Sequence, residues 1–447
     1  MIKTDILVIG GGPAGVVAAV NAKKLNPQKK VTLVRENEKG VIPCGIPYIF
    51  KRLNSVEKDL MPDKSLIVNK INLIIDKAIK LNISKKEVIL GKNKRIVFKK
   101  IILATGSGPV LLPIKGADKK GVWQIKKDFE YLKSFRKAVL NAKNIVIIGG
   151  GFIGVELAEE LSSLQGKNIS IVERLGVCLA TTFDKEFSES IEDRLKNKKV
   201  KLYLNESVQE ICGKGKVEYV KLKNKKILAD LVIFSVGARP NIDLVKDTKI
   251  KIGKNKAIVV DNYMETSKKD IFAVGDCSET KCFLTKKYIP IMLASTACHE
   301  ARIAAANLYK KQSLIKNQGT LAAFSTSIDG LAVAMVGLNE AKAKQEKIKI
   351  VIGISEATNH HPGSLPNTYK INTKLIFSKE TGKLLGGQIM GPESIGEMIN
   401  VLALAIQQGV TIYNMDTLQI ATHPLLTAAP TVYPLITAAQ NALSKLR

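Results

Sequence analysis

The sequence predicts an α/β protein with two Rossmann-like nucleotide-binding domains and a C-terminal α+β domain. Two observations predict the first part: a strand, a glycine turn, a helix and a strand open the chain, and this pattern recurs near residue 145. A third observation separates the last domain: from about residue 318 onward, the sequence pattern changes to strands that alternate with helices. The chain has 447 residues, 45% of them hydrophobic, which is enough for roughly two to four domains.

The first pattern has the form of a dinucleotide-binding unit. Its first strand covers residues 5–9 and its glycine turn residues 10–15. The helix continues to residue 25, and the second strand covers residues 31–34. Gly10 permits the tight turn, Gly12 lets a pyrophosphate approach the backbone, and Gly15 allows the helix to pack closely against the sheet. The phosphates would lie at the helix N-terminus, near Pro13 and Ala14. These residues therefore predict a bound dinucleotide.

The second pattern repeats the first. Its first strand covers residues 145–148 and its glycine segment residues 149–156. The helix continues to about residue 164, and the second strand covers residues 169–172. Gly149, Gly151 and Gly154 take the same backbone roles, with Phe152 and Ile153 between them. Two such units imply two dinucleotides. We expect one of them to be a flavin, because a flavin bridges a two-electron hydride donor and a second electron acceptor.

Glu173 ends the second strand of this unit. It falls at the distance where a carboxylate accepts hydrogen bonds from the hydroxyls of a ribose. A 2′-phosphate would be repelled there, which favours NADH over NADPH. Arg174 beside it weakens that preference, so NADPH stays an alternative.

Four further segments resemble motifs of the pyridine nucleotide–disulfide oxidoreductase superfamily, and the resemblance covers nearly the whole chain. They are residues 101–106, 235–241, 271–276 and 290–308. The resemblance implies that Ala104, Thr105 and Gly106 close the FAD-binding domain and that Gly237 ends the NAD-binding domain in the equivalent way.

The other two segments imply contacts with the flavin. In the superfamily, the aspartate that corresponds to Asp276, preceded here by Gly275, bonds the ribityl chain of FAD. The helix that includes Ala294 would point its N-terminus at the flavin, where its dipole stabilises negative charge on the reduced ring.

Residues 41–48 are similar to the single-cysteine element of coenzyme A disulfide reductases, NADH oxidases and NADH peroxidases. Cys44 stands between two prolines, where a loop is expected to enter a helix. A helix N-terminus lowers the pKa of a thiol, so we expect a reactive thiolate. Gly45 removes a side chain, so the backbone could lie close to the flavin ring.

The chain departs from the family at the end of the first flavin strand. Relatives carry a glutamate there that holds the adenosine ribose, whereas this chain has Arg35 followed by Glu36. Either Glu36 takes that role through a one-residue shift, or the ribose is held differently.

A second departure lies near the C-terminus. His423, which precedes a proline, is similar to the acid–base histidine of the two-cysteine reductases, and its pKa suits protonation of a leaving thiolate. The competing interpretation is a surface histidine at a turn, and Tyr433 is the rival proton donor. His360 and His361 indicate a polar loop, and no metal site is expected.

The motifs predict a split FAD-binding domain, an inserted NAD(P)H-binding domain and a dimerisation domain. The four segments are residues 1–112, 113–249, 250–317 and 318–447. In the last segment, residues 373–377 and 383–389 predict a hairpin, and residues 394–408 predict a long apolar helix. The resemblance implies that this domain pairs two subunits in a homodimer.

The expected activity is reduction of a low-molecular-weight disulfide or persulfide, such as coenzyme A disulfide, by NADH and FAD. By resemblance, Phe152 is a gate and Glu156 lies near the nicotinamide, and Cys44 forms a mixed disulfide with the substrate. The alternative is an NADH oxidase or peroxidase, in which oxygen or peroxide is the acceptor and Cys44 cycles through sulfenic acid.

Composition excludes several other classes. The net charge of +29 comes from scattered lysines without a basic helix, so a flavin-bearing sensor or nucleic-acid-binding module is a distant alternative. No apolar run approaches the roughly 20 residues of a membrane helix, and the N-terminus does not have the form of a signal peptide. We therefore expect a cytoplasmic enzyme without membrane or nucleic-acid partners. The six cysteines form no CxxC pairs, which argues against structural zinc.

Overall fold

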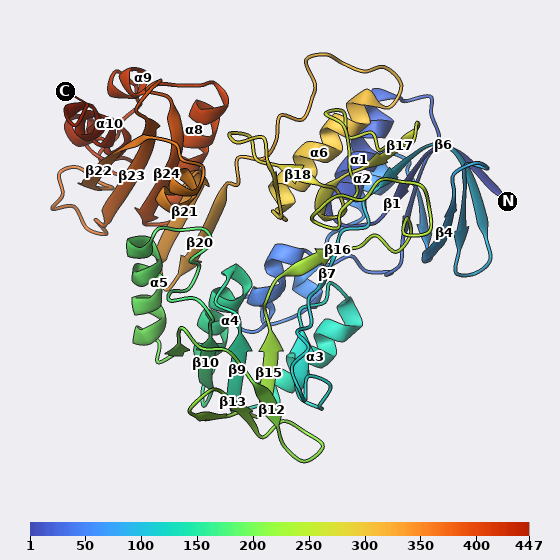
Figure 1. Ribbon diagram of the computed structural model, residues 1–447, viewed down its shortest axis with the longest axis horizontal. Coiled ribbons are helices and arrows are strands. Elements are labelled where there is room, and N and C mark those ends of the chain that lie inside the picture. Colours follow the sequence, from blue (N-terminus) through green and yellow to red (C-terminus); the bar gives the residue numbers. More distant parts are fainter. Residues whose placement is uncertain (447) are drawn as a thin grey trace.

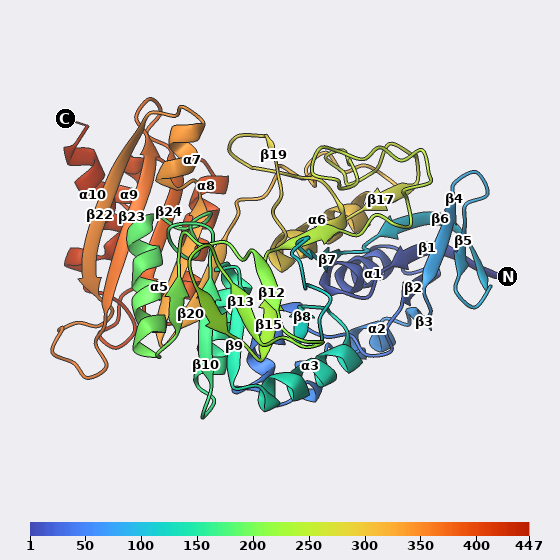
Figure 2. The same ribbon diagram turned by 60° about the horizontal axis from the view of Figure 1, so that its bottom comes forward.

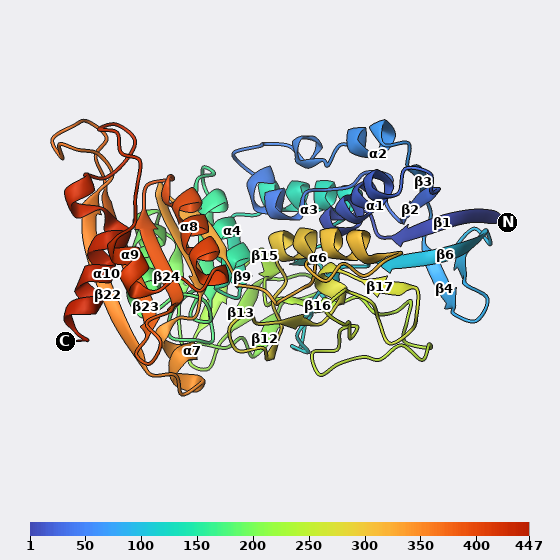
Figure 3. The ribbon, with the colours of Figure 1, turned by 90° about the horizontal axis from the view of Figure 1, so that it is seen from above.

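The structure, a computed structural model that describes residues 1–446, contains two α/β domains and a C-terminal domain built on an antiparallel sheet (Figure 1). The predicted fold class is confirmed. The chain ends lie at opposite ends of the molecule, one beside the first domain and the other beside the C-terminal domain (Figure 3). None of the helices in the described residues is long and apolar enough to cross a membrane.

The first domain is a parallel sheet extended by an antiparallel ribbon. Its strands lie in the order β3-β2-β1-β6-β5-β4, and β17 also pairs with β6. The strands are β1 (Ile2–Ile9), β2 (Val31–Arg35), β3 (Asn72–Ile75), β4 (Ala78–Asn82), β5 (Glu87–Leu90), β6 (Arg95–Leu103) and β17 (Ile271–Ala273). Helices α1 (Pro13–Leu25) and α6 (Ala294–Asn307) pack against each other beside this sheet (Figures 1 and 3). A late part of the chain therefore completes the first domain.

The second domain is a parallel sheet in the order β11-β10-β9-β15-β8, accompanied by the antiparallel sheet β12-β13-β14. Its strands are β8 (Val122–Gln124), β9 (Asn144–Ile148), β10 (Asn168–Val172), β11 (Lys201–Tyr203), β12 (Glu210–Cys212), β13 (Tyr219–Lys221), β14 (Lys226–Leu228) and β15 (Leu231–Phe234). Its helices are α3 (Phe129–Asn141), α4 (Phe152–Ser162) and α5 (Lys185–Asn197). The strands β7 (Ser107–Pro109) and β16 (Ala238–Pro240) pair where the chain enters and leaves this domain.

The C-terminal domain is an antiparallel sheet in the order β20-β21-β24-β23-β22. Its strands are β20 (Phe324–Ile328), β21 (Leu331–Gly337), β22 (Ile350–Thr358), β23 (Lys370–Ser378) and β24 (Leu384–Gly391). Its helices are α7 (Glu340–Gln345), α8 (Ile395–Gln407), α9 (Ile412–Asp416) and α10 (Pro434–Ser444). The predicted hairpin is β23 and β24, and the predicted long helix is α8. Figure 2 shows α5 of the second domain lying beside this sheet.

The segment that carries Cys44 precedes the second domain in the sequence but packs on that domain's core. The remaining short elements are η1 (Pro43–Ile49), η2 (Glu57–Asp59), α2 (Lys64–Val68), η3 (Gly275–Cys277), β18 (Thr280–Lys281), β19 (Tyr288–Ile289) and η4 (Pro430–Val432). Ile46 and Ile49 of η1 are buried in the same apolar cluster as Phe135 of α3. The ring of Phe50 meets that of Phe135 edge to face, with centroids 5.4 Å apart. These contacts fix Cys44 between the two nucleotide-binding domains.

Candidate active site

The two glycine turns have nearly the same backbone conformation. Gly12 and Gly151, which precede α1 and α4, both have φ −77° and ψ −176°. Gly10 and Gly149 have φ +118° and +107°, and a Cβ on them would lie 2.0 and 2.4 Å from a backbone carbonyl oxygen. Among the described residues, nothing lies within 4 Å of a Cβ built on Gly12 or Gly151. Each turn therefore leaves a helix N-terminus open, which suits the pyrophosphate of a dinucleotide.

The other residues of the turns set how closely helix and strand pack. Gly15 and Gly154 are buried, and a Cβ on them would lie 1.9 and 2.1 Å from the carbonyl oxygen of the first glycine of each turn. Pro13 and Ala14 form the first turn of α1, and Ile153 is exposed in the first turn of α4.

Glu173 directly follows β10, beside the second glycine turn. Its carboxylate accepts hydrogen bonds of 2.7 Å from the backbone N–H groups of Gly150 and Leu175. These bonds hold the carboxylate at the edge of the turn, where the ribose diol lies in a dinucleotide fold. Arg174, the next residue, is exposed to solvent.

Arg35 is the counterpart of Glu173 in the first domain. In each domain the second strand pairs with the first strand. The last residue of the second strand that forms such a pair is Val34 in the first domain and Val172 in the second. Arg35 and Glu173 follow them directly, so the two residues occupy equivalent positions. Glu36 is one position further along, where it is exposed and pairs with a neighbouring lysine at 3.0 Å. Glu36 therefore does not occupy the position equivalent to Glu173, and a contact between Glu36 and the ribose stays a prediction.

The segments expected to contact the flavin meet where the chain crosses between the domains. Ala104 is buried behind the first glycine turn. The Thr105 hydroxyl donates a 2.6 Å hydrogen bond to the carbonyl of Asn241, whose N–H donates a 2.9 Å bond to the carbonyl of Gly106. The carbonyl of Gly237 accepts a 3.0 Å bond from a backbone N–H just after β7.

Asp276 lies at the same junction. Its carboxylate accepts hydrogen bonds from a serine hydroxyl of β7 at 2.7 Å and from the Lys127 ammonium at 3.3 Å. The N–H of Gly275 donates a 2.8 Å bond to Glu300 of α6. Glu300 is fully buried, and burial raises its pKa to about 8. The helix that begins at Ala294 thus holds the loop that carries Asp276.

Cys44 is the second residue of η1, and the expectation that a helix N-terminus lowers its pKa is wrong. The residue is exposed, but its thiol lies against neighbouring atoms, and this burial raises its pKa. The negative charge of Glu156 raises it further, Lys127 opposes this effect, and Asp59 and Asp276 add to it. The physical reason is that η1 is a short 3₁₀ helix, whereas three carboxyl groups act on the thiol.

Gly45 leaves room for a buried carboxyl group. A Cβ on Gly45 would lie 1.8 Å from Oδ1 of Asp59. Asp59 is 1% exposed, burial raises its pKa to about 6, and its Oδ2 has no hydrogen-bond partner in residues 1–446. Its backbone carbonyl accepts a 2.9 Å bond from the N–H of Ile42. Asp59 therefore supports the turn that carries Cys44, while the expected approach of Gly45 to the flavin ring stays a prediction.

Glu156 of α4 is held by the C-terminal domain. Its Oε1 accepts a 2.8 Å hydrogen bond from the hydroxyl of Thr326 in β20. Burial raises the Glu156 pKa to about 7, and the bond from Thr326 opposes this rise. Phe152, one turn earlier on α4, stacks on Phe324 of the same strand with ring centroids 5.2 Å apart and planes 10° apart. One strand of the C-terminal domain thus contacts both residues expected near the nicotinamide.

Arg52 ties the Cys44 segment to the helix that carries this glutamate. Its guanidinium pairs with Glu159 at 2.9 Å and with Glu160 at 2.8 Å. Glu160 also accepts 3.1 Å bonds from the backbone N–H of Arg52 and of the residue before it. The guanidinium lies 5.3 Å from the ring centre of Tyr48, on the same segment as Cys44. These contacts fix the distance between the thiol and α4.

His423 and Tyr433 lie between α9 and α10. His423 is exposed, and among the described residues its hydrogen bonds stay within residues 423–427. This loop packs against the predicted polar loop, because the N–H of His361 donates a 3.0 Å bond to the carbonyl of Pro424. Tyr433 is half-buried at the start of α10, and burial raises its pKa. Neither side chain forms a hydrogen bond with Cys44 in the described part of the chain.

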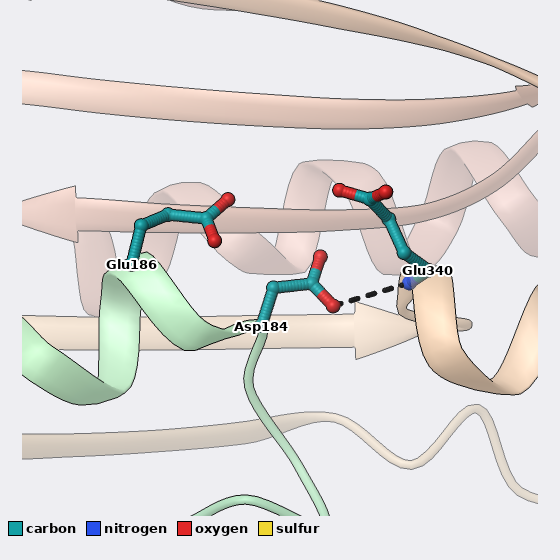
Figure 4. A group of neighbouring side chains, drawn as sticks. All are labelled: Asp184, Glu186 and Glu340. Atoms are coloured by element: carbon teal, nitrogen blue, oxygen red, sulfur yellow. Dashed lines mark hydrogen bonds between the residues drawn. The ribbon is translucent and has the colours of Figure 1, made fainter. Parts of the chain in front are cut away.

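Asp184, Glu186 and Glu340 form an acidic group at the start of α5 and α7 (Figure 4). The ammonium of Lys374 in β23 lies 2.9 Å from Asp184 and 2.6 Å from Glu186, and it also pairs with Glu340. Burial alone would lower the Lys374 pKa, but hydrogen bonds to the three carboxylates outweigh it and raise the pKa. The ammonium of Lys374 thus lies where a metal ion could otherwise bind. The group joins the second domain to the C-terminal domain.

Sequence reasoning missed Asp59, Lys127 and Thr326. Asp59 acts on Cys44, Lys127 binds Asp276, and Thr326 binds Glu156. Each lies in a segment that carries no motif. The sequence offers no signal for Asp59 or Thr326. Lys127 directly precedes Asp128, whose side chain caps α3, so a helix-start signal could have drawn attention to it.

Comparison with known proteins matches the chain to one family. Residues 4–301 match the family model described as pyridine nucleotide-disulphide oxidoreductase, and residues 325–432 match the model of its dimerisation domain. An NAD(P)H coenzyme A polysulfide/persulfide reductase from Pyrococcus horikoshii is 30% identical over 421 residues, which cover 92% of each chain. An NADH oxidase from Enterococcus faecalis is 29% identical over 423 residues, covering 92% of this chain and 93% of the relative. The structure of an NAD-dependent persulfide reductase from A. fulgidus has a TM-score of 0.91 at 27% identity and covers 99% of this chain and 83% of that one.

Proposed function

Because the chain belongs to the pyridine nucleotide-disulphide oxidoreductase family, we propose that it reduces a low-molecular-weight persulfide or disulfide, such as coenzyme A disulfide, with Cys44 as its redox-active group. The family makes it an FAD- and NAD(P)H-dependent oxidoreductase. One observation carries the choice of thiol: Cys44 is a free, exposed cysteine at the junction of the two nucleotide-binding domains.

The first domain would hold FAD and the second NADH. The open N-termini after Gly12 and Gly151 fit the two pyrophosphates, and Asp276 would accept from the ribityl chain of FAD. Glu173 would accept from the ribose hydroxyls of NADH. When bound, FAD would supply the two-electron redox chemistry that links NADH to the sulfur of Cys44. We also propose the domain boundaries at residues 112, 249 and 317.

The Cys44 thiolate would attack one sulfur of the substrate disulfide. A new S–S bond forms, and the other half of the substrate leaves as a thiolate that takes up a proton. Two electrons and a second proton then split the mixed disulfide and release the second thiol. In total, one NADH, one proton and one disulfide give NAD⁺ and two thiols. With a persulfide as substrate, the products are one thiol and hydrogen sulfide.

Glu156 is the proton donor that the same subunit offers. Its pKa, raised by burial to about 7, lets it carry a proton near neutral pH, and its charge acts on the Cys44 thiol. The competing donors are His423 and Tyr433 of the partner subunit. They require the homodimer that the dimerisation domain supports.

The second candidate function is an NADH oxidase, supported by the likeness to the Enterococcus faecalis protein of that name. Peroxide, formed from oxygen by two electrons and two protons, would then oxidise the Cys44 thiolate to a sulfenic acid and release hydroxide. Two further electrons and two protons would restore the thiol and release water. Both activities would use the same nucleotide sites and the same thiol. The two functions therefore differ in the electron acceptor.

The test is anaerobic turnover of the purified, FAD-loaded protein with NADH and coenzyme A disulfide, followed by NADH loss and thiol release. We expect two thiols per NADH, loss of turnover in Cys44→Ser, and normal turnover in the matched control Cys212→Ser. NADH loss only after oxygen is admitted would support the oxidase function instead. Equal turnover of Cys44→Ser and wild type would remove Cys44 from the reaction.

A further inference from the structure

The two nucleotide-binding domains differ in charge at one equivalent position. Arg35 and Glu173 each follow the last paired residue of the second strand. In the second domain the carboxylate of Glu173 faces the glycine turn and accepts from the N–H of Gly150. In the first domain a guanidinium stands there, although a ribose diol is bound most simply by an acceptor.

The Arg35 side chain lies against the first glycine turn. Its aliphatic part packs on Gly11, where a Cβ would lie 2.6 Å from Cδ of the arginine. Its two terminal nitrogens bind Asp63 at 2.6 and 2.8 Å in a bidentate pair, and one of them also donates to the carbonyl of Glu38. The turn and two loops thus hold the guanidinium in one orientation.

One nitrogen of this guanidinium has no hydrogen-bond partner in residues 1–446. Arg35 is 7% exposed, and its Nε is buried without a hydrogen-bond acceptor in the described residues. A buried N–H without an acceptor is unfavourable, and such groups are rare in folded proteins. Asp63 is 33% exposed, so its carboxylate keeps access to solvent beside the guanidinium. A buried donor and an accessible acceptor therefore stand next to each other at the turn.

We propose that this pair binds the adenosine ribose of the first dinucleotide, which is FAD under the proposed function on which this inference rests. The Nε–H of Arg35 donates to one ribose hydroxyl oxygen, and a carboxylate oxygen of Asp63 accepts from a hydroxyl. A diol both donates and accepts, so it satisfies both groups. Arg35 and Asp63 thereby replace the single glutamate that is expected at this place.

The test measures binding of FAD to the flavin-free protein through the change in flavin fluorescence. A second titration uses an FAD analogue whose adenosine carries 2′,3′-dideoxyribose. In wild type, the analogue should bind about ten- to a hundredfold more weakly than FAD, as loss of hydrogen bonds to charged groups predicts. Arg35→Met should bind FAD more weakly by a similar factor and should no longer distinguish FAD from the analogue.

Three further variants separate ribose binding from structural support. Arg35→Lys keeps a positive charge beside Asp63 but lacks the Nε–H, so it should also lose most of the discrimination. Asp63→Asn should lose part of it. Glu36→Gln, on the same loop, tests the alternative one-residue shift and should behave like wild type if Arg35 and Asp63 hold the ribose. Unchanged binding of NADH to the second domain shows that each variant is folded.

Equal binding of FAD and the analogue by wild type would overturn the inference, as would full discrimination in Arg35→Met. A wild type that discriminates but does not reduce persulfides or disulfides would leave the ribose site standing and remove the proposed function. A wild type that binds no FAD would overturn both.

Discussion

The carboxylate of Glu156 accepts a 2.8 Å hydrogen bond from the hydroxyl of Thr326, which joins the second nucleotide-binding domain to the first strand of the C-terminal domain. Burial raises the Glu156 pKa to about 7, and this bond opposes the rise. Since the charge of Glu156 also raises the pKa of Cys44, a residue of the C-terminal domain influences the protonation of the thiol.

Thr326→Val should therefore move the pH dependence of turnover. If Glu156 donates the proton, activity falls as pH rises through its pKa. Loss of the bond from Thr326 raises that pKa further, so the falling limb of kcat/KM should move to higher pH. The measurement is the pH profile of disulfide reduction, with Ser325→Ala, the exposed neighbouring position, as control. A shift of the falling limb to lower pH would contradict the role of Glu156.

Glu156→Gln should lower the pKa of Cys44, because it removes the nearby negative charge that contributes to the raised value. The effect should appear above about pH 7, where Glu156 is charged in wild type. The rate at which iodoacetamide alkylates Cys44, followed by mass spectrometry across pH, measures this pKa. Glu130→Gln, an exposed position on α3, should leave the rate unchanged. An unchanged or higher pKa in Glu156→Gln would refute the coupling.

Gly45→Ala should impair the Cys44 turn, because the added Cβ would lie 1.8 Å from the buried Oδ1 of Asp59. We expect at least about tenfold slower turnover, since a small misplacement of a reacting group is costly. Adding Asp59→Ala removes the obstructing carboxyl group, so the double variant should recover to the level of Asp59→Ala alone. Gly363→Ala, where a Cβ meets its nearest atom at 3.6 Å, is the control. A double variant as slow as Gly45→Ala would show that the clash is not the cause.

The fold was predictable from the sequence because its signals are local. A glycine turn, a helix of fixed length and a strand stand next to each other in the chain, so α1 ends at Leu25 as predicted. The candidate site depends on pairs that are distant in sequence. Glu156 and Thr326 are 170 residues apart, and Arg35 and Asp63 are 28 apart, so only the packed domains bring them together.

The error in the predicted Cys44 pKa has the same origin. The residues beside Cys44 predicted a helix N-terminus, which is a local effect. The pKa is instead set by burial and by Glu156, Asp59 and Asp276, which come from three other segments. Local sequence identifies the thiol, but the charges around it are a property of the tertiary structure.

Lys374→Met should destabilise the protein by about 3–5 kcal/mol, the usual cost of removing one partner from a buried ion pair. Three carboxylates, those of Asp184, Glu186 and Glu340, would then face one another without a cation. The measurement is the free energy of unfolding in urea. Lys370→Met, on the same strand but in an exposed pair with Glu356, should change it by less than about 1 kcal/mol. Equal effects of the two substitutions would contradict the role of the group.

Wild type should lose stability as pH rises, and Glu300→Gln should lose less. The pKa of Glu300 is about 8 in the folded protein, against 4.5 for a glutamate in water. A raised pKa means that its contribution to stability is complete below about pH 4.5 and is lost as pH rises through about 8. Between pH 5 and 8, the Tm of wild type should therefore fall more than that of Glu300→Gln. A parallel fall in both proteins would mean that Glu300 does not titrate there.

The chemical state of Cys44 during turnover shows whether this thiol reacts with the substrate. The FAD-loaded protein is mixed anaerobically with a limiting amount of NADH and excess coenzyme A disulfide, quenched in acid, and examined by mass spectrometry of the peptide that contains Cys44. We expect a mixed disulfide of Cys44 with one coenzyme A. A Cys44 thiol that never carries coenzyme A while NADH is consumed, or a sulfenic acid formed only with oxygen, would contradict it.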